Sequence, residues 1–181
     1  MSLVYAFLAD GFEEIEGLAV VDVLRRAGVD IQTVSVTGSK NITGSHNIKL
    51  EADLLFDECN FAQSDMLFLP GGMPGTNTLK EHKGLEEQLL EFHKAGKKIA
   101  AICAAPSVLG ELNILDGKRA TCFPGFEDKL FGAVYTGEKF ETDGNVTTAR
   151  GMGVATEFAL ELVRVLVSSE KSDEVRRTIQ M

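Results

Sequence analysis

A cysteine in this sequence stands where a strand is predicted to end and a helix to begin, a position that suits thiol chemistry. Cys103 follows the apolar segment 97–102 and precedes Pro106, which fits the first turn of a helix. At such a bend, unpaired backbone N–H groups and the positive end of the helix dipole favour a thiolate. The sequence therefore predicts a nucleophile elbow with Cys103 as an acidic, reactive thiol.

The competing interpretation is that Cys103 is a packing residue, because free cysteine is among the most buried residue types. Three small neighbours, Ala101, Ala104 and Ala105, leave room for another chain segment to approach the bend. Two further segments carry groups that could complete a site. We therefore favour the reactive role.

A glycine-rich turn follows a second apolar segment, 65–69. Its residues 70–75 read Pro-Gly-Gly-Met-Pro-Gly, and such turns expose backbone N–H groups that can bind an anion. A plain tight turn fits the same pattern. Together with the N–H of Ala104, the N–H of Gly72 is the expected stabiliser of an oxyanion formed at Cys103.

Three acids, Glu13, Glu14 and Glu16, open the first predicted helix. Acids in a first helical turn are favoured by the helix dipole and are commonly solvated. Glu16 is different because it lies between the apolar Ile15 and Gly17. An ionised carboxylate would repel a thiolate, so Glu16 can assist Cys103 when it is buried, protonated and donating a hydrogen bond.

The sequence does not indicate which histidine, if any, could act as a base for Cys103. His82 and His93 fall in segments predicted to be helical surface, and His46 falls in the polar stretch 37–51, which predicts a hairpin of undetermined position.

Alternating strand and helix patterns run through the whole chain and predict a three-layer α/β sandwich with a mainly parallel sheet. The predicted strands are 3–9, 30–36, 54–57, 65–69, 97–102, 118–121, 131–135 and 146–149, and the predicted helices are 13–27, 76–81, 84–95, 107–112, 154–167 and 172–179. Because parallel strands end at one edge, the loops after Ala9, Leu69 and Ile102 are expected to converge.

The composition narrows the class of protein. With 181 residues and 44% hydrophobic content, one domain spanning 1–181 is expected. A net charge of −9 argues against nucleic acid and anionic membranes as partners. The three cysteines form neither a disulfide framework nor a metal motif, which favours a reducing cytoplasm and no metal. The N-terminal segment predicts a strand rather than a signal peptide, and no stretch is long and apolar enough for a membrane helix.

The chain resembles the ThiJ/PfpI superfamily, in particular its DJ-one branch of parkinsonism-associated and bacterial deglycase-type proteins. The matching segments are 10–16 (Asp-Gly-Phe-Glu-Glu-Ile-Glu), 21–28, 69–72, 100–106, 150–151 and 157–159. The resemblance implies a flavodoxin-like sandwich with an elbow of the class I glutamine amidotransferase type, a homodimer and no cofactor. It also implies that Cys103 is the readily oxidised thiol and Glu16 its protonated partner.

The same resemblance implies glutathione-independent glyoxalase or deglycase activity on reactive aldehydes or glycated substrates. A non-catalytic redox sensor or chaperone that uses oxidation of Cys103 is the alternative, since it needs the same groups. Two positions depart from the family pattern: Phe123 replaces a histidine, which disfavours a PfpI-type protease, and His46 replaces an arginine. The expected pocket contributors are Gly71, His46, Phe123 and Arg26.

Overall fold

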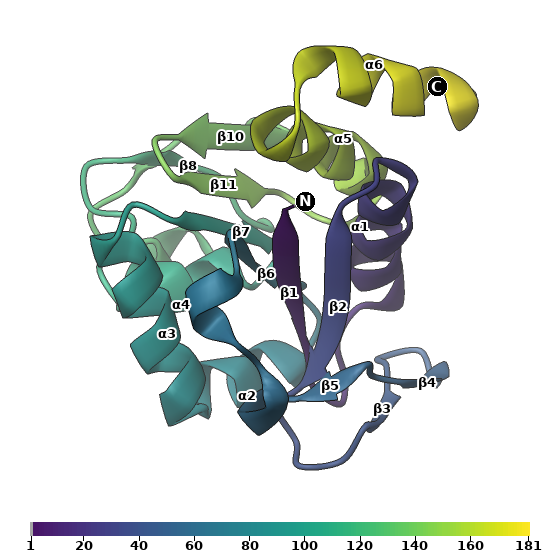
Figure 1. Ribbon diagram of the computed structural model, residues 1–181. Coiled ribbons are helices and arrows are strands. Elements are labelled where there is room, and N and C mark those ends of the chain that lie inside the picture. The colour runs from purple at the N-terminus through teal and green to yellow at the C-terminus, as the bar shows by residue number, and fades with distance from the viewer. Residues whose placement is uncertain (1) are drawn as a thin grey trace.

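The structure, a computed structural model, describes residues 2–181 and is organised around a seven-stranded sheet (Figure 1). The strand order is β10–β11–β7–β6–β1–β2–β5. Neighbouring strands pair in parallel except for β10 and β11, which are antiparallel. These strands are β1 (Leu3–Leu8), β2 (Asp30–Ser35), β5 (Leu54–Leu55), β6 (Met66–Leu69), β7 (Lys98–Ile102), β10 (Phe140–Asp143) and β11 (Val146–Ala149).

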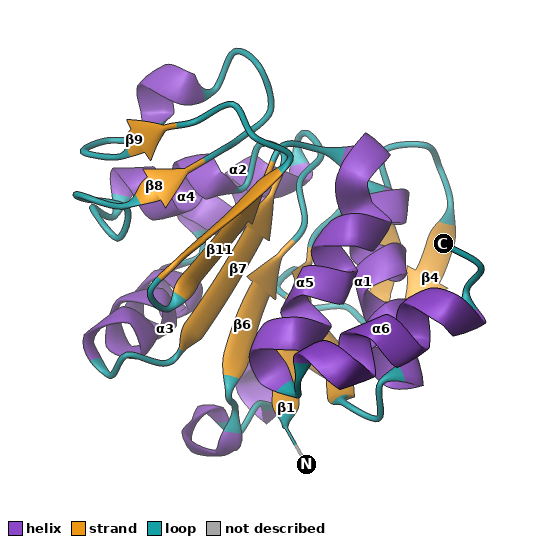
Figure 2. Ribbon diagram, turned by 90° about the horizontal axis from the view of Figure 1, so that it is seen from above, coloured by secondary structure: helices purple, strands orange, loops and turns teal. Residues whose placement is uncertain are grey.

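Six helices cover the two faces of this sheet (Figure 2). On one face lie α1 (Glu14–Arg26), α5 (Ala155–Leu166) and α6 (Ser169–Thr178), and on the other α2 (Gly75–Glu81), α3 (Lys83–Lys94) and α4 (Pro106–Glu111). The predicted three-layer, mainly parallel α/β sandwich of flavodoxin-like type is confirmed.

Side-chain alternation along the central strand explains the two cores. In β1, Tyr5 and Phe7 pack on the α2–α4 side, whereas Val4 and Ala6 pack on the α1–α5–α6 side. Successive residues of a strand point to opposite faces, so a strand covered on both sides needs apolar residues at every position. This is why the central strands are nearly continuous apolar runs.

Two small sheets lie outside the main one. The predicted hairpin in 37–51 is formed by β3 (Asn41–Thr43) and β4 (Lys49–Glu51), which are antiparallel. The second small sheet pairs β8 (Arg119–Ala120) with β9 (Val134–Tyr135), so the strands predicted at 118–121 and 131–135 are shorter than expected.

Strand β10 was missed by the sequence analysis. Its four residues, Phe-Glu-Thr-Asp, are polar enough to read as a turn, yet they pair with β11 at the edge of the sheet. An edge strand needs no continuous apolar run, because one of its sides faces solvent. The last helix also begins earlier than predicted, at Ser169, because the Ser168 side chain accepts the N–H of Lys171.

Each helix between residues 2 and 181 is too short or too polar to cross a lipid bilayer. The three cysteines, Cys59, Cys103 and Cys122, are free thiols.

Candidate active site

Cys103 occupies the predicted elbow between β7 and α4. Its φ is +65°, in the left-handed region that residues with a side chain rarely adopt. Two backbone hydrogen bonds of 2.8 Å fix this conformation: the Cys103 N–H donates to the Ala149 carbonyl, and the Phe123 N–H donates to the Cys103 carbonyl. Strained backbone of this kind persists where neighbouring contacts over-determine it, and it is concentrated at functional sites.

The turn after β6 packs directly against the thiol and Glu16. The Gly71 N–H donates to Glu16 Oε2 at 2.9 Å, and the Gly71 carbonyl accepts the N–H of Glu13 at 2.9 Å. A Cβ atom on Gly71 would lie 2.6 Å from both Cys103 Cβ and Glu16 Oε2. Glycine is therefore required here by close approach, and the predicted convergence of the three loops is present.

Glu16 is completely buried in the first turn of α1. Its other carboxyl oxygen, Oε1, has no hydrogen-bond partner among residues 2–181. Burial raises the pKa of Glu16 to about 7, and the charge of Glu13 adds to this, although the Gly71 N–H and the nearby Cys103 side chain and Met152 backbone oppose the shift. A carboxyl group with this pKa keeps its proton in a large share of molecules at neutral pH, which is the state that assistance to Cys103 needs.

The electrostatics of Cys103 differ from the prediction of an acidic thiol. Burial, together with the Glu16 carboxylate, raises the pKa of Cys103 to about 12, and the N–H groups of Ala104 and Gly72 lower it by less. The sequence analysis recognised the repulsion by an ionised Glu16 but overlooked the larger cost of burying the thiolate. When Glu16 is protonated this repulsion is absent and its O–H can donate to sulfur, so ionisation of the thiol is coupled to the proton on Glu16.

The β3–β4 hairpin meets the start of α1 through Glu14. The Glu14 carboxylate accepts the His46 N–H at 2.8 Å and lies 3.0 Å from His46 Nδ1, and it also accepts the Ile48 N–H at 3.3 Å. Burial opposes ionisation of Glu14, but these hydrogen bonds prevail and lower its pKa to about 2. Glu14 is therefore a buried, ionised anchor for the hairpin, which the sequence analysis did not foresee.

His46 belongs to this anchor. Its side chain is 70% exposed, and no hydrogen bond within residues 2–181 joins it to Cys103 or Glu16. Ligand atoms of Glu13, Glu14 and His46 lie within 4.8 Å of one another, a spacing that could hold a cation. Because the Glu14 oxygens already accept several N–H groups, we interpret this cluster as structural.

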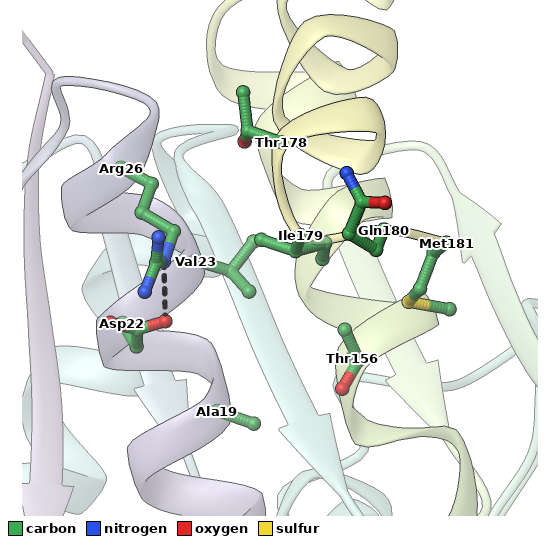
Figure 3. Close-up of a pocket in the computed structure, with 9 residues that line it drawn as sticks. All are labelled: Ala19, Asp22, Val23, Arg26, Thr156, Thr178, Ile179, Gln180 and Met181. Atoms are coloured by element: carbon green, nitrogen blue, oxygen red, sulfur yellow. Dashed lines mark hydrogen bonds and ion pairs between the residues drawn. The ribbon is translucent and has the colours of Figure 1, made fainter.

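Arg26 was predicted to contribute to the pocket, and the structure places it elsewhere. It lies in the last turn of α1, ten residues beyond Glu16 and hence about 15 Å along the helix axis. Its guanidinium pairs with Asp22 at 2.6 Å, beside a hollow formed with the C-terminal residues 178–181 (Figure 3). Arg26 and Glu16 belong to the same helix, but they lie at opposite ends of it, so Arg26 does not reach the site.

A fourth loop, after β11, also reaches the site and was not assigned a role from the sequence. The Met152 backbone lowers the pKa of Glu16, and a Cβ on Gly151 would lie 4.0 Å from Glu16 Oε1. The available indication was the glycine pattern at the end of another parallel strand next to β7. Glu13 was named among the acids of the first helix, but its capping role was not predicted: its Oε2 accepts the Glu16 N–H at 2.7 Å and so caps α1.

Comparisons with known proteins identify the family of this chain. The chain is 39% identical over 176 residues to Protein DJ-1 homolog B of Arabidopsis thaliana, covering 96% of this chain but 40% of that protein, so it spans less than half of that relative's length. It is 31% identical over 160 residues to a protein of Pyrococcus abyssi named a deglycase, covering 87% of this chain and 95% of that protein.

Among solved structures, oxidized DJ-1 of Toxoplasma gondii superposes with a TM-score of 0.95 at 30% identity, covering 99% of this chain and 98% of that one. The family model described as the DJ-1/PfpI family matches residues 2–165. The chain therefore belongs to the DJ-1/PfpI family.

Proposed function

We propose that this protein is a cysteine-dependent enzyme acting on reactive carbonyl compounds, of the glyoxalase or deglycase type. The observation that carries the proposal is the placement of Cys103, on a strained elbow, beside a buried Glu16 whose pKa is raised to about 7. A group with that pKa can both give and take a proton at neutral pH, which is what isomerisation of an α-oxoaldehyde requires. The deglycase name of the Pyrococcus abyssi relative supports the same substrate class.

The first step is addition of sulfur to the aldehyde. The Cys103 thiolate attacks the aldehyde carbon, a C–S bond forms, and the electron pair of the C=O bond moves to oxygen. The proton of Glu16 passes to that oxygen and gives a hemithioacetal. The N–H groups of Gly72 and Ala104 are the donors available to the developing negative charge.

The second step moves a proton between carbons. Glu16, now a carboxylate, removes the hydrogen of the former aldehyde carbon as a proton and returns it to the adjacent ketone carbon. A proton shifts between the two oxygens, which leaves a thioester of a 2-hydroxy acid. Water then adds to the thioester while Glu16 takes its proton, and Cys103 departs as thiolate. The sum is one dicarbonyl plus one water, giving lactate from methylglyoxal.

Deglycation follows from the same chemistry. A glycated amine in equilibrium with the free dicarbonyl is cleared when the dicarbonyl is consumed. No cofactor takes part in these steps, because protons move and no electrons are transferred to an external acceptor.

A steady-state assay with methylglyoxal tests this proposal, with Cys103→Ser as the control. We expect lactate formation by the native chain that is lost in the variant. A rate equal to that of Cys103→Ser would contradict the enzyme and leave the redox sensor, in which Cys103 is oxidised to a sulfinate held by the same N–H groups. A Cys-His protease is disfavoured, because Phe123 stands where the family pattern has histidine.

We also infer a homodimer. Three apolar side chains at the start of α1 and on the hairpin are exposed: Ile15 (50%), Leu18 (38%) and Ile48 (51%). The Ile48 N–H donates to Glu14 Oε1 at 3.3 Å, so the hairpin residue lies beside the helix and the three extend one surface. Exposed apolar patches of this kind mark interaction surfaces.

Light scattering after gel filtration tests the dimer. We expect twice the 19.6 kDa of one chain for the native protein and a shift to one chain for Leu18→Glu. Leu90→Glu, at an exposed position of α3, is the control that should leave the mass unchanged. A native mass of 19.6 kDa would exclude the dimer. A reducing compartment such as the cytoplasm fits the three free thiols.

A further inference from the structure

Three large apolar side chains are exposed on the loops that supply the groups around Cys103. They are Met73, Phe123 and Met152, with exposed fractions of 47%, 47% and 52%. They come from three different loops, which follow β6, β8 and β11. Single exposed apolar residues are common on proteins, but three around one reactive group need an explanation.

Phe123 is tied to the elbow by its own backbone. Its N–H donates to the Cys103 carbonyl at 2.8 Å. Its ring lies over Gly151, since a Cβ on Gly151 would be 3.2 Å from ring atom Cδ2 and 4.0 Å from Glu16 Oε1. A side chain at position 151 would therefore contact both the Phe123 ring and the Glu16 carboxyl group, which places Gly151 between them.

The two methionines each follow a residue of the site. Met152 comes directly after Gly151, and its backbone faces Glu16, whose pKa it lowers. Met73 comes directly after Gly72, whose N–H lowers the pKa of Cys103. Adjacent Cα atoms are about 3.8 Å apart, so both side chains start within a few ångströms of the reacting groups. Met and Phe side chains offer adaptable apolar contact.

We propose that these three side chains, the apolar rim, select α-oxoaldehydes that carry an aryl-sized apolar group on the ketone carbon in preference to methylglyoxal. This inference rests on the proposed function and names its substrate class. The reaction is unchanged: phenylglyoxal plus water gives mandelate, with sulfur adding to the aldehyde carbon while the aryl group lies on the rim. In an apolar pocket one added or missing methylene group changes kcat/KM by about tenfold or more.

Two variants and a matched control test the rim. Phe123→Ser and Met152→Ser remove apolar surface at the site, and Met181→Ser removes a methionine of 51% exposure beyond the end of α6. The ratio of kcat/KM for phenylglyoxal to that for methylglyoxal is measured for each. We expect the ratio to fall about fivefold to tenfold in the two rim variants and to stay at the native value in the control.

A second readout does not depend on turnover. Alkylation of Cys103 by N-phenylmaleimide and by N-methylmaleimide is followed by mass spectrometry of the peptide that contains it. In the native chain we expect N-phenylmaleimide to alkylate Cys103 faster than N-methylmaleimide does. The ratio of the two rates should fall in Phe123→Ser and Met152→Ser. This measurement also reveals whether a variant has merely lost its fold, because both reagents would then react faster and equally.

The possible failures are distinguishable. Suppose that both dicarbonyls are turned over, but that the kcat/KM ratio and the ratio of alkylation by the two maleimides are the same in the native chain and in all variants. The rim then has no selective role and this inference is wrong, while the proposed function stands. If neither dicarbonyl is consumed faster than by Cys103→Ser, the proposed function fails and the substrate assignment fails with it. If the ratios are unchanged and the rim variants alter the mass in solution, the rim is a contact between copies and the inference is also wrong.

Discussion

The carboxylate of Glu16 accepts a hydrogen bond from the backbone N–H of Gly71 at 2.9 Å, and this contact joins the first turn of α1 to the turn after β6. It holds one oxygen of the acid, and the other has no hydrogen-bond partner among the residues that the structure describes. A buried carboxylate with so few partners is costly when ionised. The fold thereby keeps a proton available next to Cys103.

Replacing Gly71 by alanine should disrupt this arrangement. The new Cβ would lie 2.6 Å from Cys103 Cβ and from Glu16 Oε2, which forces the two groups apart. We expect Cys103 alkylation and any turnover to fall at least about tenfold, with about 1–3 kcal/mol lost in stability by denaturant unfolding. Gly153→Ala is the control, since nothing lies within 4 Å of its added Cβ. Equal behaviour of the two variants would contradict the close approach.

The stability of the protein should fall with pH because of Glu16. Its pKa is raised from 4.5 to about 7 in the fold, so its stabilising contribution is complete below pH 4.5 and is lost as pH rises through 7. Relative to Glu16→Gln, the free energy of unfolding of the native chain should fall by about 3 kcal/mol as the pH rises from 4.5 to above 7. Urea unfolding of both proteins at several pH values measures this, and a difference independent of pH would count against a buried, protonated Glu16.

Glu14 should produce the opposite dependence. Its pKa is lowered from 4.5 to about 2, so its contribution is present above pH 4.5 and is lost as pH falls toward 2. Glu14→Gln should destabilise the protein by about 3 kcal/mol at neutral pH and by much less in acid. Thermal unfolding across this range is the measurement. A variant as stable as the native chain at pH 7 would show that the hairpin does not depend on this carboxylate.

The backbone at Cys103 should be strained in a measurable way. Its φ of +65° suits glycine, so Cys103→Gly should be more stable than Cys103→Ala by about 1 kcal/mol. Both variants lack the thiol, and the comparison therefore isolates the backbone. Elsewhere in a strand or helix the same exchange favours alanine, so a more stable alanine variant would refute a left-handed elbow.

Much of the fold was predictable because local patterns and tertiary packing agree. Continuous apolar runs such as 3–9 and 65–69 belong to strands covered on both faces, and α1 is marked by acids at its start and Gly28 after its end. Edge elements were less predictable. β10 is polar and depends on pairing with β11, which no local pattern records.

The site residues that follow a parallel strand could be predicted from the sequence, because such strands end at the same edge of the sheet. Cys103, Glu16 and Gly71 follow the ends of neighbouring parallel strands, so their meeting follows from topology. The prediction that Arg26 contributes to the pocket was wrong, because the rise of the helix separates it from Glu16. The prediction of an acidic Cys103 was wrong because the pKa of the thiol depends mainly on a burial cost, which only three-dimensional packing reveals.

The pH dependence of Cys103 alkylation tests the coupling of the thiol to Glu16 most directly. The Cys103–Glu16 pair shares its first ionisation, whose apparent pKa lies at or below the Glu16 value of about 7, and the thiolate beside a protonated Glu16 is one of the two singly ionised forms. We predict that iodoacetamide reactivity of the native chain rises with an apparent pKa at or below about 7. In Glu16→Leu the thiol has lost its proton partner but remains buried, and its apparent pKa should exceed the ordinary 9.0. The same apparent pKa in both proteins would contradict the account.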